Sequence, residues 1–139
     1  MSVNTDRYQT AAARYFEAWN ATEPEARGKA VAEAWAPEGG YTDPPPEGGP
    51  PADVAGYAQI TAVIAAAHEQ FPGFVFRPLG IADGHHDTAR FGWELVNEAG
   101  GTPSGGGSAP VAGFDVVTLS EDGRILRVLG FLDRVPAGA

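Results

Sequence analysis

Cysteine is absent from this chain of 139 residues. Without a thiol, the chain can form no disulfide, no thiolate metal site and no cysteine nucleophile. Basic residues are also scarce, because nine Lys and Arg stand against 18 Asp and Glu and give a formal net charge of −9. Binding to nucleic acid or to an anionic membrane calls for clustered positive charge, which no part of the sequence offers. We therefore expect neither partner.

Long apolar runs are missing as well. No window approaches 18 consecutive apolar residues, so we expect no transmembrane helix. The first residues show no basic region followed by an apolar stretch, so we expect no signal peptide. The composition is globular, with 43% hydrophobic and 19% charged residues. We expect a single cytoplasmic domain over residues 1–139, with its core at about 6–135.

The first half of the chain has the apolar spacing of helices. Residues 8–19 predict an amphipathic helix, and a second helix is predicted to open at Thr22 in a capping box and to end before residue 39. A third is predicted to begin at an Asp53 cap, to carry His68 near its end and to close before residue 72. Between the second and third helices, we expect a short strand at residues 41–43 and a proline-rich loop up to residue 51.

The second half alternates with a period of two. Strands are predicted over residues 74–81, 88–97, 111–119 and 124–133, with a Gly-, Ser- and Pro-rich loop at 100–110. Helices followed by strands predict an α+β fold, with the helices on one face of a mainly antiparallel sheet. If that sheet is strongly curved, it encloses a pocket between its concave face and the helices.

Asp115 is a carboxylate in the middle of a run that otherwise predicts a buried strand. Alternation places it on the same face as Val117 and Leu119. Because desolvation disfavours a charged carboxylate, Asp115 is either paired or kept protonated for a purpose. One interpretation is a neutral acid that donates a hydrogen bond to a developing oxyanion. The other is a carboxylate partnered by backbone or by an arginine such as Arg90 or Arg127.

A second aspartate, Asp43, precedes Pro44 at the end of the short predicted strand. Two carboxylates in different settings can run acid and base chemistry together. Asp43 is thus a candidate base that moves a proton next to a carbonyl, or else it ends the strand through a side-chain turn. Tyr15 is a candidate second oxyanion donor, or else a core tyrosine of the first helix.

Three segments carry a resemblance to a known family: residues 14–17 (Arg-Tyr-Phe-Glu), residues 41–44 (Tyr-Thr-Asp-Pro), and residues 114–117 (Phe-Asp-Val-Val) followed by the turn at 121–125. Together with the element order, they resemble the nuclear-transport-factor-2-like superfamily. Its members include ketosteroid isomerases and SnoaL-like polyketide cyclases. The resemblance implies a cone-shaped, curved sheet with three helices packed on its concave face, and a homodimer formed through the exposed face of the sheet.

The resemblance to ketosteroid isomerases also implies roles for three residues. Asp43 falls on the base, Tyr15 on the hydrogen-bonding tyrosine, and Asp115 on the protonated aspartate. Epoxide hydrolases of the same fold resemble the chain less, because Gly92 and Gly130 stand where those enzymes have acids.

Five aromatic residues are candidates to line an apolar pocket, although most aromatics in a small domain belong to the core. They are Trp19, Tyr57, Phe76, Trp93 and Phe131. Neither a metal nor another cofactor is expected, since the adjacent His85 and His86 lack neighbouring ligands.

These residues predict acid–base isomerisation or cyclisation of a small hydrophobic carbonyl compound through an enolate-like intermediate. Two alternatives stay open: a non-catalytic binding protein for an apolar small molecule, and a dimeric interaction module.

Overall fold

The computed structural model describes residues 3–43, 52–97 and 111–134 of the chain. The elements follow one another as helices α1 (Val3–Asn20) and α2 (Pro24–Ala34), strands β1 (Gly40–Asp43) and β2 (Ala52–Ala55), helix α3 (Tyr57–Gln70), and strands β3 (Phe74–His85), β4 (Thr88–Asn97), β5 (Val111–Leu119) and β6 (Ile125–Arg134). Among the described helices, none is both long and apolar enough to cross a bilayer.

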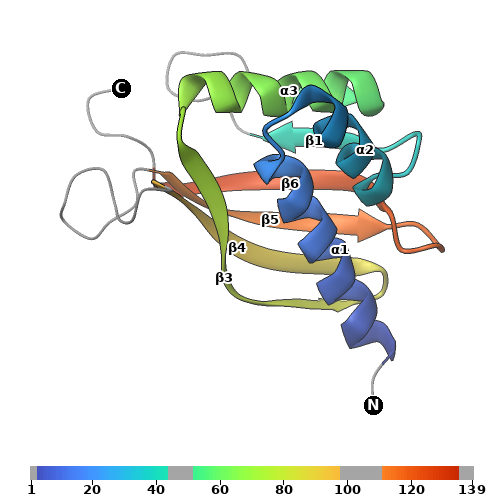
Figure 1. Cartoon of the computed structure of the whole chain (residues 1–139). Helices are drawn as coiled ribbons and strands as arrows, with labels where there is room; N and C mark the ends of the chain where they lie inside the picture. The colour runs from blue at the N-terminus through green and yellow to red at the C-terminus, as the bar shows by residue number, and fades with distance from the viewer. Residues whose placement is uncertain (1–2, 44–51, 98–110, 135–139) are drawn as a thin grey trace.

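The strands form one six-stranded sheet in the order β2-β1-β6-β5-β4-β3. Every neighbouring pair is antiparallel except β1 and β6, which are parallel. All three helices lie on the same side of this open sheet, with α1 running diagonally across it (Figure 1). The predicted α+β fold, a curved and mainly antiparallel sheet covered by three helices, is therefore confirmed.

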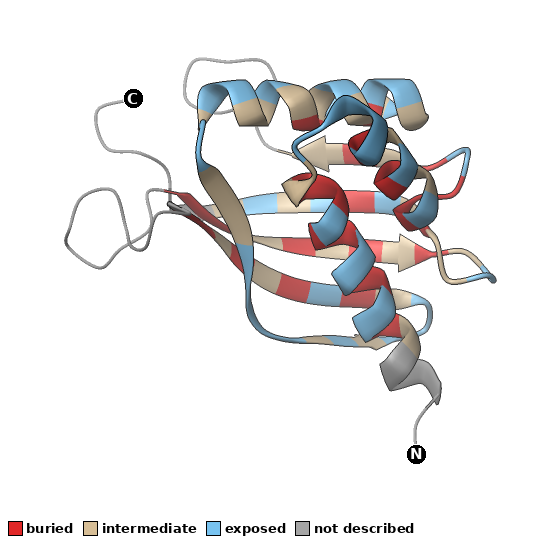
Figure 2. Ribbon diagram, viewed as in Figure 1, coloured by how far each residue is buried: buried red, intermediate tan, exposed pale blue. Residues whose placement is uncertain are grey.

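The core lies between α1 and the covered face of the sheet. Along β5 the burial alternates, so that Asp115, Val117 and Leu119 point inward, as the sequence predicted. On β4, Phe91 and Trp93 are buried, and Phe91 packs against Tyr15 and Phe16 of α1. Figure 2 shows buried stretches both along α1 and along the strands that it crosses. The middle of the sheet is thus a dry environment, and any polar group there must find a partner inside the protein.

Two predicted helix starts are wrong. α2 begins at Pro24 with Glu23 as its N-cap and without a side-chain cap. Pro24 sets this boundary, because its fixed φ angle suits the first helical turn and its missing N–H costs nothing there. Asp53 does not cap α3, because it lies in β2 opposite Thr42. Pairing with β1 takes this segment into the sheet, and Gly56, at a φ of 88°, turns the chain into α3.

The strands of the second half are confirmed, although β3 continues to His85, beyond the predicted end at residue 81, and has an irregular register between Leu79 and Asp83. The turn before β6 is confirmed as well, with Gly123 at a φ of 87°. The predicted loops at 44–51 and 100–110 lie outside the described residues.

Candidate functional site

The site centres on Asp115, which β5 places under α1. Tyr15 lies on the buried face of α1, and its hydroxyl donates to Asp115 Oδ2 over 2.5 Å. Each of the two residues is only 3% exposed. Arg90 and Arg127, the arginine partners considered from the sequence, are both exposed, and Arg90 pairs with Asp83. The partner of Asp115 is therefore a neutral hydroxyl and not an arginine.

This environment makes Asp115 a weak acid. Desolvation raises its pKa to about 6, although the Tyr15 hydrogen bond and the nearby Trp93 indole N–H both lower it, and the charge of Asp43 raises it further. Burial and the Asp115 charge also hold the pKa of Tyr15 well above its usual value. Tyr15 thus remains a donor throughout the range in which Asp115 gains and loses its proton.

Asp43 lies beside this pair, at the end of β1. It accepts a 2.8 Å hydrogen bond from the Tyr41 hydroxyl, which comes from the same short strand. Gly130 on β6 separates the two aspartates: a Cβ there would stand 3.2 Å from Asp115 Oδ1 and 3.2 Å from the Asp43 Cβ. The missing side chain at Gly130 therefore lets two carboxyl groups share one region of the covered face.

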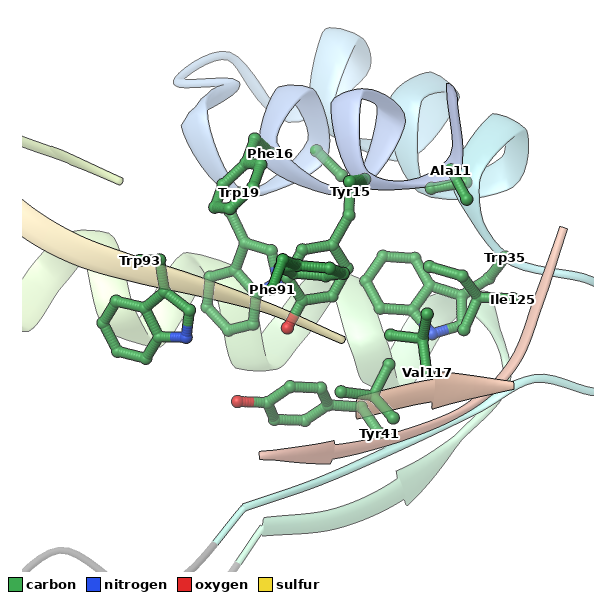
Figure 3. Close-up of a cluster of buried hydrophobic side chains, with 14 of the residues drawn as sticks. Ala11, Tyr15, Phe16, Trp19, Trp35, Tyr41, Phe91, Trp93, Val117 and Ile125 are labelled. Atoms are coloured by element: carbon green, nitrogen blue, oxygen red, sulfur yellow. The ribbon is translucent and has the colours of Figure 1, made fainter. Parts of the chain in front are cut away.

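Aromatic rings surround the two carboxyl groups. Trp19 packs on Tyr41 and on Phe76, with ring centroids 5.4 and 5.0 Å apart, and Phe76 packs on Trp93 at 5.3 Å. Figure 3 shows the Tyr15 and Tyr41 hydroxyls and the Trp93 indole nitrogen directed toward one another. Of the five predicted pocket residues, Trp19, Phe76 and Trp93 are therefore brought to the candidate site.

Tyr57 and Phe131 are not brought to it. The Tyr57 hydroxyl donates to the Trp35 carbonyl and accepts from Arg124, at the start of α3. Phe131 is 50% exposed on the outer face, since alternation along β6 turns it away from the side to which Gly130 belongs. Leu129 is exposed on the same outer face, where the resemblance places a subunit contact, and that contact stays a prediction.

Tyr41 is a functional candidate that sequence reasoning missed. Residues two apart on a strand share one face, so the pattern Tyr41-Thr42-Asp43 already placed this hydroxyl beside the candidate base. Burial raises the pKa of Tyr41 well above its usual value, and the charge of Asp115 contributes to the same shift. Tyr41 is thus a hydrogen-bond donor that orients Asp43.

A groove of about 240 Å³ opens between α1 and β3. Phe16 and Phe91 line it, and their rings also pack against Tyr15 at 5.8 and 5.2 Å. The groove is thus a neighbour of the acidic site, separated from it by aromatic rings. In the described ranges, no three His, Asp or Glu side chains gather as a metal site would require.

A family model, the SnoaL-like domain, matches residues 12–128. A solved structure from Agrobacterium tumefaciens str. C58, named as a candidate isomerase of the SnoaL-like family, is 37% identical over 92% of this chain and 98% of that one, with a TM-score of 0.77. The chain therefore belongs to the SnoaL-like family. None of the curated proteins matches it.

Two more distant structures support the fold alone. A protein from Jannaschia sp. CCS1, named as a candidate SnoaL-like polyketide cyclase, is 20% identical, with a TM-score of 0.71 over 96% of this chain and 90% of that one. A nuclear-transport-factor-2-like protein from Exiguobacterium sp. 255-15 is 18% identical, with a TM-score of 0.62 over 88% of this chain and 98% of that one.

Proposed function

We propose that the protein catalyses acid–base isomerisation or cyclisation of a small hydrophobic carbonyl compound through an enolate-like intermediate, without a cofactor. The observation that carries this proposal is the buried Tyr15–Asp115 pair beside Asp43. A carboxyl group whose pKa is raised to about 6 can hold a proton when an apolar ligand dries the site further.

Each residue has one role in this reaction. Asp43, oriented by Tyr41, takes a proton from the carbon next to the substrate carbonyl. Tyr15 and protonated Asp115 donate hydrogen bonds to the carbonyl oxygen, which becomes an oxyanion as the proton leaves. The substrate oxygen replaces Asp115 as the acceptor of the Tyr15 hydroxyl. The aromatic rings of Trp19, Phe76 and Trp93 keep water away and so strengthen these hydrogen bonds.

The test is a titration with 2-naphthol, whose ionised oxygen mimics the enolate. At a pH below the pKa of free naphthol, the wild-type protein is expected to bind it as naphtholate, detected by absorbance at wavelengths beyond those of tryptophan. Asp115→Asn and Tyr15→Phe are expected to lose this spectrum. Naphthol bound in its neutral form by the wild type would overturn the proposal and favour the alternative, a non-catalytic apolar binding protein.

Asp43→Asn is the matched variant for the base. It is expected to keep the naphtholate spectrum, because it leaves Tyr15 and Asp115 intact. It is also expected to slow exchange of the α-protons of a cyclic ketone in D2O, followed by NMR, by about 10²- to 10⁴-fold. Unchanged exchange in this variant would remove Asp43 from the mechanism.

A further inference from the structure

Two of the three tryptophans have an indole N–H that is buried and finds no hydrogen-bond acceptor among the described residues. They are Trp19 and Trp93, which are 5% and 8% exposed. Trp35 provides the contrast, because its Nε1 donates to the Gly40 carbonyl over 3.2 Å. Buried donors are nearly always satisfied in folded proteins, so two unpartnered ones in the same region require an explanation.

Both free donors lie next to the Tyr15–Asp115 pair. The Trp93 N–H is close enough to Asp115 to lower its pKa, and the Trp19 N–H does the same for Tyr15. In Figure 3, the Trp93 nitrogen is directed toward the side on which the Tyr15 hydroxyl lies. An oxygen atom bound beside Tyr15 and Asp115 would therefore have two indole donors near it.

The surrounding residues hold the two rings in these positions. Trp19 lies against Tyr41 and Phe76, and Trp93 lies against Phe76. Trp93 also covers Gly113, where a Cβ would come within 2.7 Å of the Trp93 Cε2 atom. Because any larger residue at this position would displace the ring, Gly113 allows the indole to pack closely against β5 with its N–H near Asp115.

We propose that Trp19 and Trp93 are ligand-binding residues, whose indole N–H groups donate to the ligand oxygen held by Tyr15 and Asp115. This inference rests on the proposed function and adds two donors to it. A hydrogen bond is strongest when its acceptor carries a full negative charge. The four donors together therefore select a ligand whose oxygen is ionised, or becomes ionised during the reaction, over a neutral ligand of the same shape.

The experiment compares 2-naphthol with naphthalene, which has the same ring system and no oxygen. Affinities for both are measured on the wild type, Trp93→Phe and Trp19→Phe, together with the share of bound naphthol that is ionised. Trp35→Phe is the matched control, since it removes an indole whose N–H already has a backbone acceptor. Circular dichroism confirms that each variant is folded, and a variant that does not fold is replaced by the corresponding Trp→Leu change, which also removes the donor.

The two variants are expected to lose about ten- to a hundredfold in naphtholate affinity and to bind naphthalene as the wild type does. Trp35→Phe is expected to leave the ratio of the two affinities unchanged. If Trp93→Phe and Trp19→Phe keep the naphtholate spectrum while Tyr15→Phe loses it, this inference fails and the proposed function stands. An equal loss of both ligands would show that the rings act by shape alone and would also overturn the inference. A wild type without any naphtholate spectrum contradicts the proposed function itself.

Discussion

Asp115 and Asp122 lie on the same β5–β6 hairpin, but their pKa values are shifted in opposite directions from that of an ordinary aspartate. In the middle of β5, desolvation raises the pKa of Asp115 to about 6. In the turn, Asp122 accepts hydrogen bonds from the Ser120 hydroxyl and from the backbone and guanidinium of Arg124, which lower its pKa to about 2. The two residues have the same side chain, so the difference comes from where each carboxyl group lies.

Desolvation has the largest effect on the pKa of Asp115, and hydrogen bonding has the largest effect on the pKa of Asp122. The Tyr15 hydrogen bond and the nearby Trp93 indole N–H both lower the pKa of Asp115, yet the desolvation caused by burial outweighs them. Asp122 is exposed, so it loses almost no hydration on folding, and each hydrogen-bond donor stabilises its charged form. The weak acid of the site is therefore a product of the α1–β5 contact, and a strand carboxylate without α1 above it would be an ordinary one.

The largest expected effect is on stability, in the variant Asp115→Asn. Because the folded pKa of Asp115 lies above the unfolded one, the folded state binds the proton more tightly, and wild-type stability falls as pH rises from about 4 to about 6. Asparagine carries no charge and can still accept from Tyr15. A shift of roughly two units, at about 1.4 kcal/mol each, predicts that the variant gains about 3 kcal/mol over the wild type between pH 4 and pH 7.

Urea unfolding at pH 4, 5, 6 and 7 measures this difference. The free energies of unfolding of the two proteins are expected to diverge steadily over that window and to run parallel above it. A difference that stays constant from pH 4 to pH 7 would mean that Asp115 titrates at its ordinary pKa, and the contrast with Asp122 would then disappear.

A smaller effect is expected from Gly113→Ala, which tests whether packing maintains the dry site. The added Cβ would stand 2.5 Å from the Phe131 carbonyl oxygen and would collide with the Trp93 ring. Overpacking of this kind costs about 1–3 kcal/mol, and displacement of the ring admits water to Asp115. We expect lower stability in urea together with a lower Asp115 pKa, measured by carboxyl NMR. A destabilised variant with an unchanged Asp115 pKa would show that the packing of Trp93 does not maintain the raised pKa of Asp115.

Much of the fold and part of the site could be predicted from the sequence. Alternation along residues 111–119 was enough to predict that Asp115 is buried, because the period of a strand can be recognised from the local sequence alone. The sequence pattern could not show which face of the sheet Phe131 occupies, because that face depends on the register that sets Gly130 opposite Asp115. Nor could it find the free indole groups, because a missing acceptor depends on every neighbour of the ring. The local sequence predicts Asp53 as a helix cap, because the strand partner that holds it in β2 lies in β1 and is not local to it.

The smallest expected effect comes from Asp122→Asn, and it has the opposite sign to that of Asp115→Asn. Because the folded pKa of Asp122 lies below the unfolded one, its charge stabilises the fold above about pH 4, and this contribution is lost as pH falls toward 2. The variant is therefore expected to be slightly less stable than the wild type at pH 7 and to match it near pH 2.

The effect is small because the ion pair between Asp122 and Arg124 is exposed to solvent, and exposed ion pairs contribute little to the free energy of unfolding. Added salt is expected to shrink the difference at pH 7, whereas the larger difference caused by Asp115→Asn persists in salt because that carboxyl group is shielded from ions. Urea unfolding of both variants with and without 1 M NaCl makes the comparison. If salt reduced both differences equally, the two carboxyl groups would share one environment, and a buried weak acid could no longer be assigned to β5.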